Sequence, residues 1–183
     1  MSDTDRVPTT QGPDAALLAT LRAMARGTLV ERLGIELLEA TPERVVGTMP
    51  VAGNTQPLGL LHGGATVALA ETLGSYAAAL HAGPGRSAVG IEVSATHHRG
   101  VRDGVVTGRA TAVHLGGTTA SYEIVVEDET SRRICTARLT CLLMTDRGES
   151  QSPDTSDRPA VAATGPSGSG ATADADPVAA SRD

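Results

Sequence analysis

The chain contains no phenylalanine, no tryptophan and no lysine, and only two tyrosines among its 183 residues. A core of aliphatic side chains packs adequately without aromatic rings, so this scarcity does not exclude a folded domain. It argues against the aromatic surfaces on which many proteins stack single-stranded nucleic acid. We interpret the composition as a bias of the source genome and not as a sign of function.

Positive charge is also scarce, since 15 arginines face 21 acidic residues and the formal net charge is −6. Residues 146–183 carry seven acidic residues and three arginines, a net −4, so residues 1–145 retain only −2. A nearly neutral domain argues against a nucleic-acid partner. The terminal segment has no hydrophobic periodicity and predicts a disordered acidic tail over 146–183. Residues 1–12 are predicted to be a flexible N-terminal segment, which leaves 13–145 as the folded domain.

The two cysteines, Cys135 and Cys141, lie in one apolar run that predicts a single strand. Six residues of strand separate them by about 20 Å, whereas a disulfide needs Cα atoms within roughly 7 Å. Both are therefore predicted to be free core thiols. Reduced thiols, together with the lack of a signal peptide and of a long apolar run, predict a cytoplasmic protein with no membrane partner.

The helix predicted to begin at Gly63 is apolar on nearly every side, which is typical of a buried helix. Its only carboxylate between His62 and His81 is Glu71. An ionised carboxylate that is buried without a partner is costly, so such a group usually pairs, shifts its pKa or takes part in chemistry. Glu71 is therefore the first candidate for a functional residue.

Hydrophobic periodicity also predicts an amphipathic helix over 15–34 with a break near Gly27. Runs of strand-forming residues between turn residues predict six strands, at 35–40, 44–51, 87–97, 104–115, 118–128 and 132–144. The last four follow one another without a helix, so we expect an antiparallel meander. One long helix against one antiparallel sheet predicts an α+β fold, and its uncovered sheet edge suggests an oligomer.

Alternation in the strand predicted at 87–97 places its odd-numbered apolar positions on the inward face. His97 is then expected to point inward and His98 outward.

Three segments carry a resemblance to a known family. QPLGLLHGGATVALAETLGS (56–75), IEVSATHHR (91–99) and HLGGT (114–118), in this order and spacing, resemble the hotdog-fold acyl-CoA thioesterases of the PaaI-like group. The resemblance covers roughly residues 15–145 and is strongest to members acting on aryl thioesters, such as 1,4-dihydroxy-2-naphthoyl-CoA and Glu-type 4-hydroxybenzoyl-CoA thioesterases. It implies a central helix wrapped by an antiparallel sheet. It also implies a homodimer or homotetramer with active sites at the subunit interface, and no metal or redox cofactor.

The resemblance also implies roles for individual residues in the hydrolysis of an acyl-CoA to free acid and CoA. Glu71 matches the carboxylate that attacks the thioester carbonyl or activates water, and Gly63 matches the backbone donor to the thioester oxygen. Gln56 and His62 match groups near the carbonyl, and Ser75 matches a serine one turn after the carboxylate. The family's contacts to coenzyme A correspond to Gly90, His97, His98, Arg99, Gly100, His114, Leu115, Gly116, Gly117, Thr118 and Thr119.

The chemistry of these residues supports such a site independently. Gly63 and Gly64 stand where a helix begins, so their backbone N–H groups are expected to be unpaired and able to stabilise a tetrahedral oxyanion. Ser75 lies four residues after Glu71 and shares its helix face. Eight residues of helix place Glu71 about 12 Å from Gly63. The carboxylate is therefore expected to come from the neighbouring subunit.

Other interpretations stay open for these residues. Glu71 could be a carboxylate with only a structural role, and His62 could be a residue of the turn before the helix. Gln56 could form hydrogen bonds only to the loop backbone, and Ser75 could be a packing residue. A metal site of His62, Glu71 and His97 matches no known ligand spacing, and a Ser75 nucleophile lacks a strained turn such as G-x-S-x-G. For the whole chain, the alternatives are a non-catalytic acyl-CoA-binding module and a dehydratase or hydratase acting on acyl thioesters.

Overall fold

Three helices and six strands make up the computed structural model, which describes residues 14–146. The predicted segment 1–12 and the predicted tail beyond Asp146 lie outside the described residues. In chain order the elements are α1 (Ala15–Met24), α2 (Leu29–Arg32), β1 (Glu36–Ala40), β2 (Arg44–Pro50), α3 (Gly63–Ala82), β3 (Arg86–His97), β4 (Val105–Leu115), β5 (Thr119–Glu127) and β6 (Arg133–Thr145).

The predicted N-terminal helix is divided into α1 and α2, as expected from Gly27. The Asp14 carboxylate begins α1 by accepting hydrogen bonds from the N–H groups of Ala16 and Leu17, at 3.0 and 3.1 Å. Gly27 has a φ of 73° and Gly34 a φ of 66°, a backbone conformation that side chains disfavour. The two glycines therefore bound the short helix α2 on either side.

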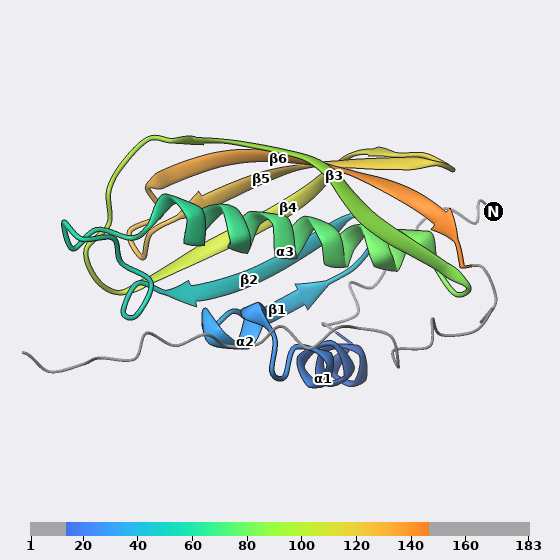
Figure 1. The fold of residues 1–183 in the computed structure, drawn as a ribbon, viewed down its shortest axis with the longest axis horizontal. Coiled ribbons are helices and arrows are strands. Elements are labelled where there is room, and N and C mark those ends of the chain that lie inside the picture. The colour runs from blue at the N-terminus through green and yellow to red at the C-terminus, as the bar shows by residue number, and fades with distance from the viewer. Residues whose placement is uncertain (1–13, 147–183) are drawn as a thin grey trace, which may run out of the picture. The chain divides into compact units, whose positions relative to one another are not determined.

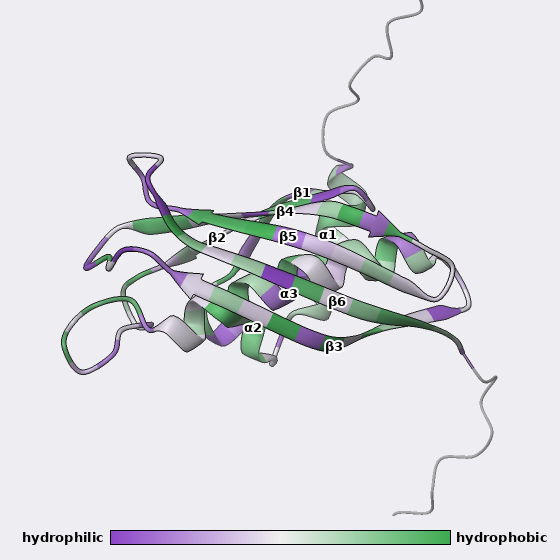
Figure 2. Ribbon diagram, turned by 90° about the horizontal axis from the view of Figure 1, so that it is seen from above, coloured by the Kyte–Doolittle hydropathy of each residue, from purple (hydrophilic) through white to green (hydrophobic). Residues whose placement is uncertain are grey.

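All six strands form one antiparallel sheet in the order β1-β2-β4-β5-β6-β3. Strands β4, β5 and β6 form the expected meander, but the prediction that β3 begins this meander is wrong. Figure 2 shows β3 at an edge of the sheet, beside β6. The seven residues 98–104 can extend about 24 Å, whereas three strand spacings need only about 14 Å. The link to β4 can therefore cross the sheet instead of closing a hairpin.

A bulge in β3 changes which of its side chains face the helix. The register with β6 shifts between Gly90 and Glu92, which leaves Ile91 as the extra residue. Before the bulge Gly90 pairs with Cys141, and after it Val93 pairs with Leu139, so both face the buried side. The prediction that every odd-numbered position of this strand faces inward is therefore wrong for Val89. Beyond the bulge the expected alternation holds, and His97 faces inward opposite Cys135.

Helix α3 lies against one face of the sheet, as Figure 1 shows, and nine of its residues are buried there. Glycines let it approach closely, because a Cβ at Gly108 would lie 2.6 Å from Leu73 Cδ1. The opposite face of α3 is uncovered, and Glu71 and Ala79 are exposed on it. The prediction of a helix buried all round is thus wrong for a single chain, because one sheet covers only one side of a helix. Within residues 14–146, no helix is long and apolar enough to span a bilayer.

Candidate active site

The loop before α3 is fastened by a buried asparagine that sequence reasoning did not single out. The side-chain amide of Asn54 donates to the carbonyls of Leu33 and Pro50, at 2.8 and 2.9 Å. Its backbone carbonyl accepts a hydrogen bond of 2.8 Å from His62 N–H. Asn54 thus joins the end of α2, the end of β2 and the start of α3. An asparagine in a loop without periodicity gives no sequence signal for such a role.

His62 is the N-cap of α3. Its Nδ1 accepts a hydrogen bond of 2.8 Å from Gly64 N–H, so in this arrangement Nδ1 carries no proton. The neutral ring then carries its proton on Nε2 and can donate from there. The prediction that both glycine N–H groups are unpaired is wrong for Gly64, because its N–H group donates to the His62 side chain. Gly63 N–H has no hydrogen-bond partner among the described residues and can serve as an oxyanion donor.

A pocket of about 370 Å³ lies at this end of α3 and gathers several of the predicted site residues. The Gln56 Oε1 atom accepts a hydrogen bond of 2.6 Å from Leu58 N–H, which leaves its amide group as a donor. The His97 ring packs on Gly63, where a Cβ would lie 3.0 Å from His97 Nε2. The predicted residues that line the pocket are Gln56, Gly63, His97, His98, Arg99 and Gly100.

His98 and Arg99 are held mainly by the neighbouring strand β6. His98 Nε2 and Thr136 Oγ1 form a hydrogen bond of 2.9 Å, on the outward face that alternation predicts. The Arg99 guanidinium donates to the Arg133 carbonyl at 2.7 Å. These contacts fix two cationic or ionisable groups at the rim of the pocket, close to the positive end of the α3 dipole.

Glu71 lies in a second pocket, a groove of about 440 Å³ along the uncovered face of α3. None of the three ion pairs within residues 14–146 includes its carboxylate. Gly90 allows the carboxylate to approach β3, because a Cβ at Gly90 would lie 3.7 Å from Glu71 Oε1. The groove is lined by Leu29, Val30, Ala68, Glu71, Thr72, Ser75, Tyr76, Ala79 and Ala88.

Ser75 and Glu71 both influence the pKa of the buried Cys141 thiol. Burial raises the pKa of the Cys141 thiol above its ordinary value, the Ser75 hydroxyl opposes this rise, and the negative charge of Glu71 adds to it. Cys141 is therefore a protonated thiol. Burial likewise raises the pKa of the Tyr76 hydroxyl, so this group in the groove is an uncharged phenol.

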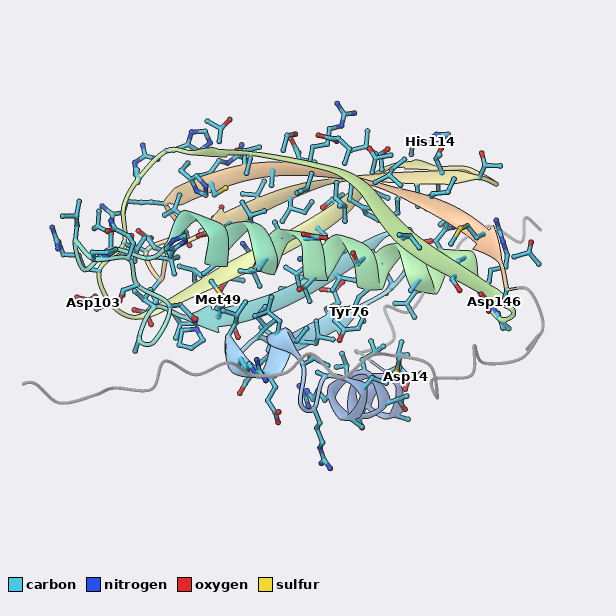
Figure 3. All side chains as sticks on the ribbon, in the orientation of Figure 1. Asp14, Met49, Tyr76, Asp103, His114 and Asp146 are labelled. Carbon is cyan, nitrogen blue, oxygen red and sulfur yellow. The ribbon has the colours of Figure 1, made fainter. Side chains whose placement is uncertain are left out.

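The second predicted coenzyme A segment, residues 114–119, lies elsewhere. It is bound near the end of α3, where His81 Nε2–H donates to the Gly116 carbonyl at 2.9 Å. Figure 3 shows Asp103 and His114 toward opposite ends of the molecule. In β6, Cys135 pairs with His97 of β3 whereas Leu142 pairs with Thr119 of β5, so one chain does not bring residues 97–100 and 114–119 together.

Within one chain the predicted catalytic residues likewise form two groups. Gln56, His62 and Gly63 lie at the start of α3, whereas Glu71 and Ser75 lie in the groove farther along the helix. This separation agrees with the distance of about 12 Å expected from the helix rise. Residues 14–146 contain no cluster of three His, Cys, Asp or Glu side chains that could hold a metal ion.

Comparison with known proteins shows the family. A sequence profile of the Thioesterase superfamily matches residues 58–135. The proofreading thioesterase EntH of Cronobacter turicensis is 50% identical over 128 residues, which span 69% of this chain and 93% of that protein. Among solved structures, a mutant of thioesterase PA1618 from Pseudomonas aeruginosa matches with a TM-score of 0.68 at 40% identity, covering 74% of this chain and 97% of the other.

Thioesterase HI1161 from Haemophilus influenzae matches with a TM-score of 0.67 at 39% identity, covering 70% of this chain and 90% of the other. The profile match includes the helix that carries Glu71, and the structural matches confirm the predicted hotdog fold. The chain therefore belongs to the Thioesterase superfamily and is a thioester hydrolase.

Proposed function

We propose that this thioesterase hydrolyses an aryl acyl-CoA, of the hydroxybenzoyl, dihydroxynaphthoyl or phenylacetyl type, to the free acid and CoA. The observation that carries the proposal is the Glu71 carboxylate, which lines an apolar groove and forms no ion pair in the described chain. The groove volume of about 440 Å³ lies within the range of small-molecule sites. Small side chains at Ala68 and Thr72 leave room for a flat ring beside the carboxylate.

Two routes use Glu71 in this reaction. As a general base, it takes a proton from water, whose oxygen attacks the thioester carbon; the C–S bond breaks and CoA leaves as a thiolate that is then protonated. As a nucleophile, its oxygen attacks the same carbon and forms a mixed anhydride, which water then hydrolyses. In both routes Gly63 N–H stabilises the developing oxyanion, and the Gln56 amide and His62 Nε2–H polarise the carbonyl. Ser75 orients the carboxylate or the water.

The site is proposed to be completed by a second copy of the chain in a homodimer, alone or paired into a homotetramer. Within residues 14–146, β3 is an edge strand with one unpaired side, and Val89, Ile91 and Val93 are exposed along it. Antiparallel pairing of two β3 strands would place the start of one beside the end of the other. The groove holding Glu71 would then approach the pocket at Gly63 of the second copy. Coenzyme A would bind across the same boundary, between residues 97–100 and 114–119.

Two further proposals concern the setting of the reaction. Buried, free Cys135 and Cys141 support a cytoplasmic location. Similarity to a proofreading thioesterase supports a second candidate role, in which the hydrolysed thioester is an unwanted product.

The proposal is tested by CoA release from the purified full chain on acetyl-, hexanoyl-, phenylacetyl-, benzoyl- and 4-hydroxybenzoyl-CoA. Glu71→Gln removes the negative charge and keeps the shape, so we expect a loss of about 100-fold or more, the scale of general acid–base catalysis. Glu36→Gln, at an exposed position of β1, is the matched control and should leave release unchanged. We expect the aryl substrates to give the highest kcat/KM.

Four other outcomes would contradict the proposal. A wild type that releases no CoA would favour the non-catalytic acyl-CoA-binding module. A fully active Glu71→Gln variant would make Glu71 a structural carboxylate and overturn its role in hydrolysis. Conversion of added 3-hydroxyhexanoyl-CoA to the enoyl thioester without release of CoA would favour a dehydratase or hydratase. A preference for the aliphatic substrates would agree with thioesterase activity but would exclude an aryl acyl-CoA as the substrate class.

A further inference from the structure

The short helix α2 forms one wall of the groove that contains Glu71. Leu29 and Val30 of α2 and Ala88 of β3 line this groove together with residues of α3. No functional signal distinguishes α2 in the sequence, because its residues continue the apolar spacing of α1. The structure places its apolar residues in the same groove as the Glu71 carboxylate.

Several hydrogen bonds hold α2 in this position. The Asn54 side chain binds the Leu33 carbonyl, Ile35 N–H donates to the Val30 carbonyl at 3.0 Å, and Gly27 N–H donates to Glu31 Oε2 at 2.7 Å. Val30 is half-buried against the core, whereas Leu29 is 59% exposed in the single chain. The wall therefore has a fixed backbone and an apolar side chain that is free to contact a bound molecule.

We propose that α2 determines the acyl specificity of this enzyme, with Leu29 and Val30 in contact with the acyl group. This inference rests on the proposed function of Glu71. If that carboxylate reacts at the thioester carbon, the acyl group must begin within its reach and extend along the groove. The small residues Ala68, Thr72 and Ala79 form the floor there, so the side chains of α2 limit how wide an acyl group the groove accepts.

Acyl contacts of this kind have a measurable effect on selectivity. One methylene gained or lost in an apolar pocket changes discrimination by roughly 10- to 200-fold. Leu29 is suitable for substitution because its exposure means that a change there removes little core packing. Leu29→Trp should fill the groove, and Leu29→Ala should widen it.

The test measures kcat/KM of the full-length variants on acetyl-, hexanoyl-, benzoyl- and 4-hydroxybenzoyl-CoA. We expect Leu29→Trp to retain acetyl-CoA hydrolysis within about 2-fold and to lose about 10-fold or more on the two aryl substrates. Leu29→Ala should shift the preference toward larger acyl groups. The matched control is Leu38→Trp, at a 45% exposed leucine of β1 that does not line the groove, and it should keep the wild-type order of substrates.

The outcomes separate this inference from the proposed function. An active wild type whose substrate order is unchanged in both Leu29 variants would overturn the role of α2 alone. A uniform loss on every substrate in Leu29→Trp, accompanied by a change in oligomeric mass, would show that a second copy of the chain occupies the groove and would also overturn it. A wild type that is inactive on the whole panel would overturn both proposals.

Discussion

The two ring nitrogens of His62 can serve different purposes, one structural and one in the proposed reaction. Its Nδ1 accepts the Gly64 N–H and so fixes the first turn of α3, where Gly63 N–H is left free. That bond also sets the tautomer, so that Nε2 carries the proton of the neutral ring. The structural interpretation of His62 and the catalytic one are therefore compatible, because each concerns a different nitrogen.

The two roles separate in a pair of substitutions. Asparagine is a favoured N-cap, whereas alanine is not, and loss of a cap costs about 1 kcal/mol. We expect His62→Ala to lower the free energy of unfolding in urea by about that amount and His62→Asn to keep it near the wild-type value. Both variants lack the Nε2–H donor, so CoA release should fall about 10-fold or more in each. Full activity in His62→Asn would limit His62 to capping.

At the residue scale, Glu71 and Gly63 stand out as candidates from the sequence because a lone carboxylate on an apolar helix and glycines at a helix start are local features. The sequence could not show that Gly64 N–H donates to the His62 side chain, since this hydrogen bond depends on the conformation of that side chain. Asn54 and Leu29 were missed for a different reason. Their importance comes from contacts with segments far away in the chain, such as the start of α3 and the groove beside Glu71.

At the scale of elements, the close approach of α3 to the sheet depends on glycine, which has no side chain. A Cβ at Gly108 would lie 2.6 Å from Leu73 Cδ1 and 3.3 Å from Leu69 Cδ2, and both leucines are fully buried. Interiors packed this closely absorb extra atoms only by moving neighbouring side chains or backbone. The position of α3, and with it that of Glu71, therefore depends on glycine at this point of β4.

We expect Gly108→Ala to lower the free energy of unfolding by about 1 kcal/mol or more, because overpacking outweighs the entropy that alanine removes from the unfolded chain. The control is Gly117→Ala, where an added Cβ meets no atom within 4 Å. Urea unfolding of both variants measures the difference. Equal stability of the two variants would mean that α3 shifts without cost, contrary to the packing described here.

The positions of the helices and strands could be predicted from the sequence because glycine, proline and polar turns separate strongly periodic runs. The place of β3 in the sheet could not. A strand that joins its neighbour by a hairpin and one that crosses the sheet can have the same composition, and residues 98–104 suit either. The bulge at Ile91 also lacks a sequence signal, and it reverses the faces of the residues before it, including Val89.

At the scale of the whole molecule, a single chain holds the proposed catalytic groups in two separate pockets. Glu71 lies in the groove of about 440 Å³, whereas Gly63 lines the pocket of about 370 Å³ at the start of α3. The uncovered face of α3 and the unpaired edge of β3 adjoin the same groove, through Glu71 and Ala88. A second chain paired along β3 would cover this edge and supply the missing half of each site, so activity should depend on association.

Ile91 tests this dependence, because it is the bulge residue of the edge strand and is 57% exposed. A lysine at an edge opposes strand pairing, so we expect Ile91→Lys to be a folded monomer in sedimentation, with CoA release reduced about 10-fold or more. Val113→Lys, at a 54% exposed position of β4, is the matched control. It should keep at least the dimer and its activity, even if contacts between dimers are lost. A monomeric Ile91→Lys variant with wild-type activity would place Glu71 and its oxyanion donor in one chain, and the composite site would have to be abandoned.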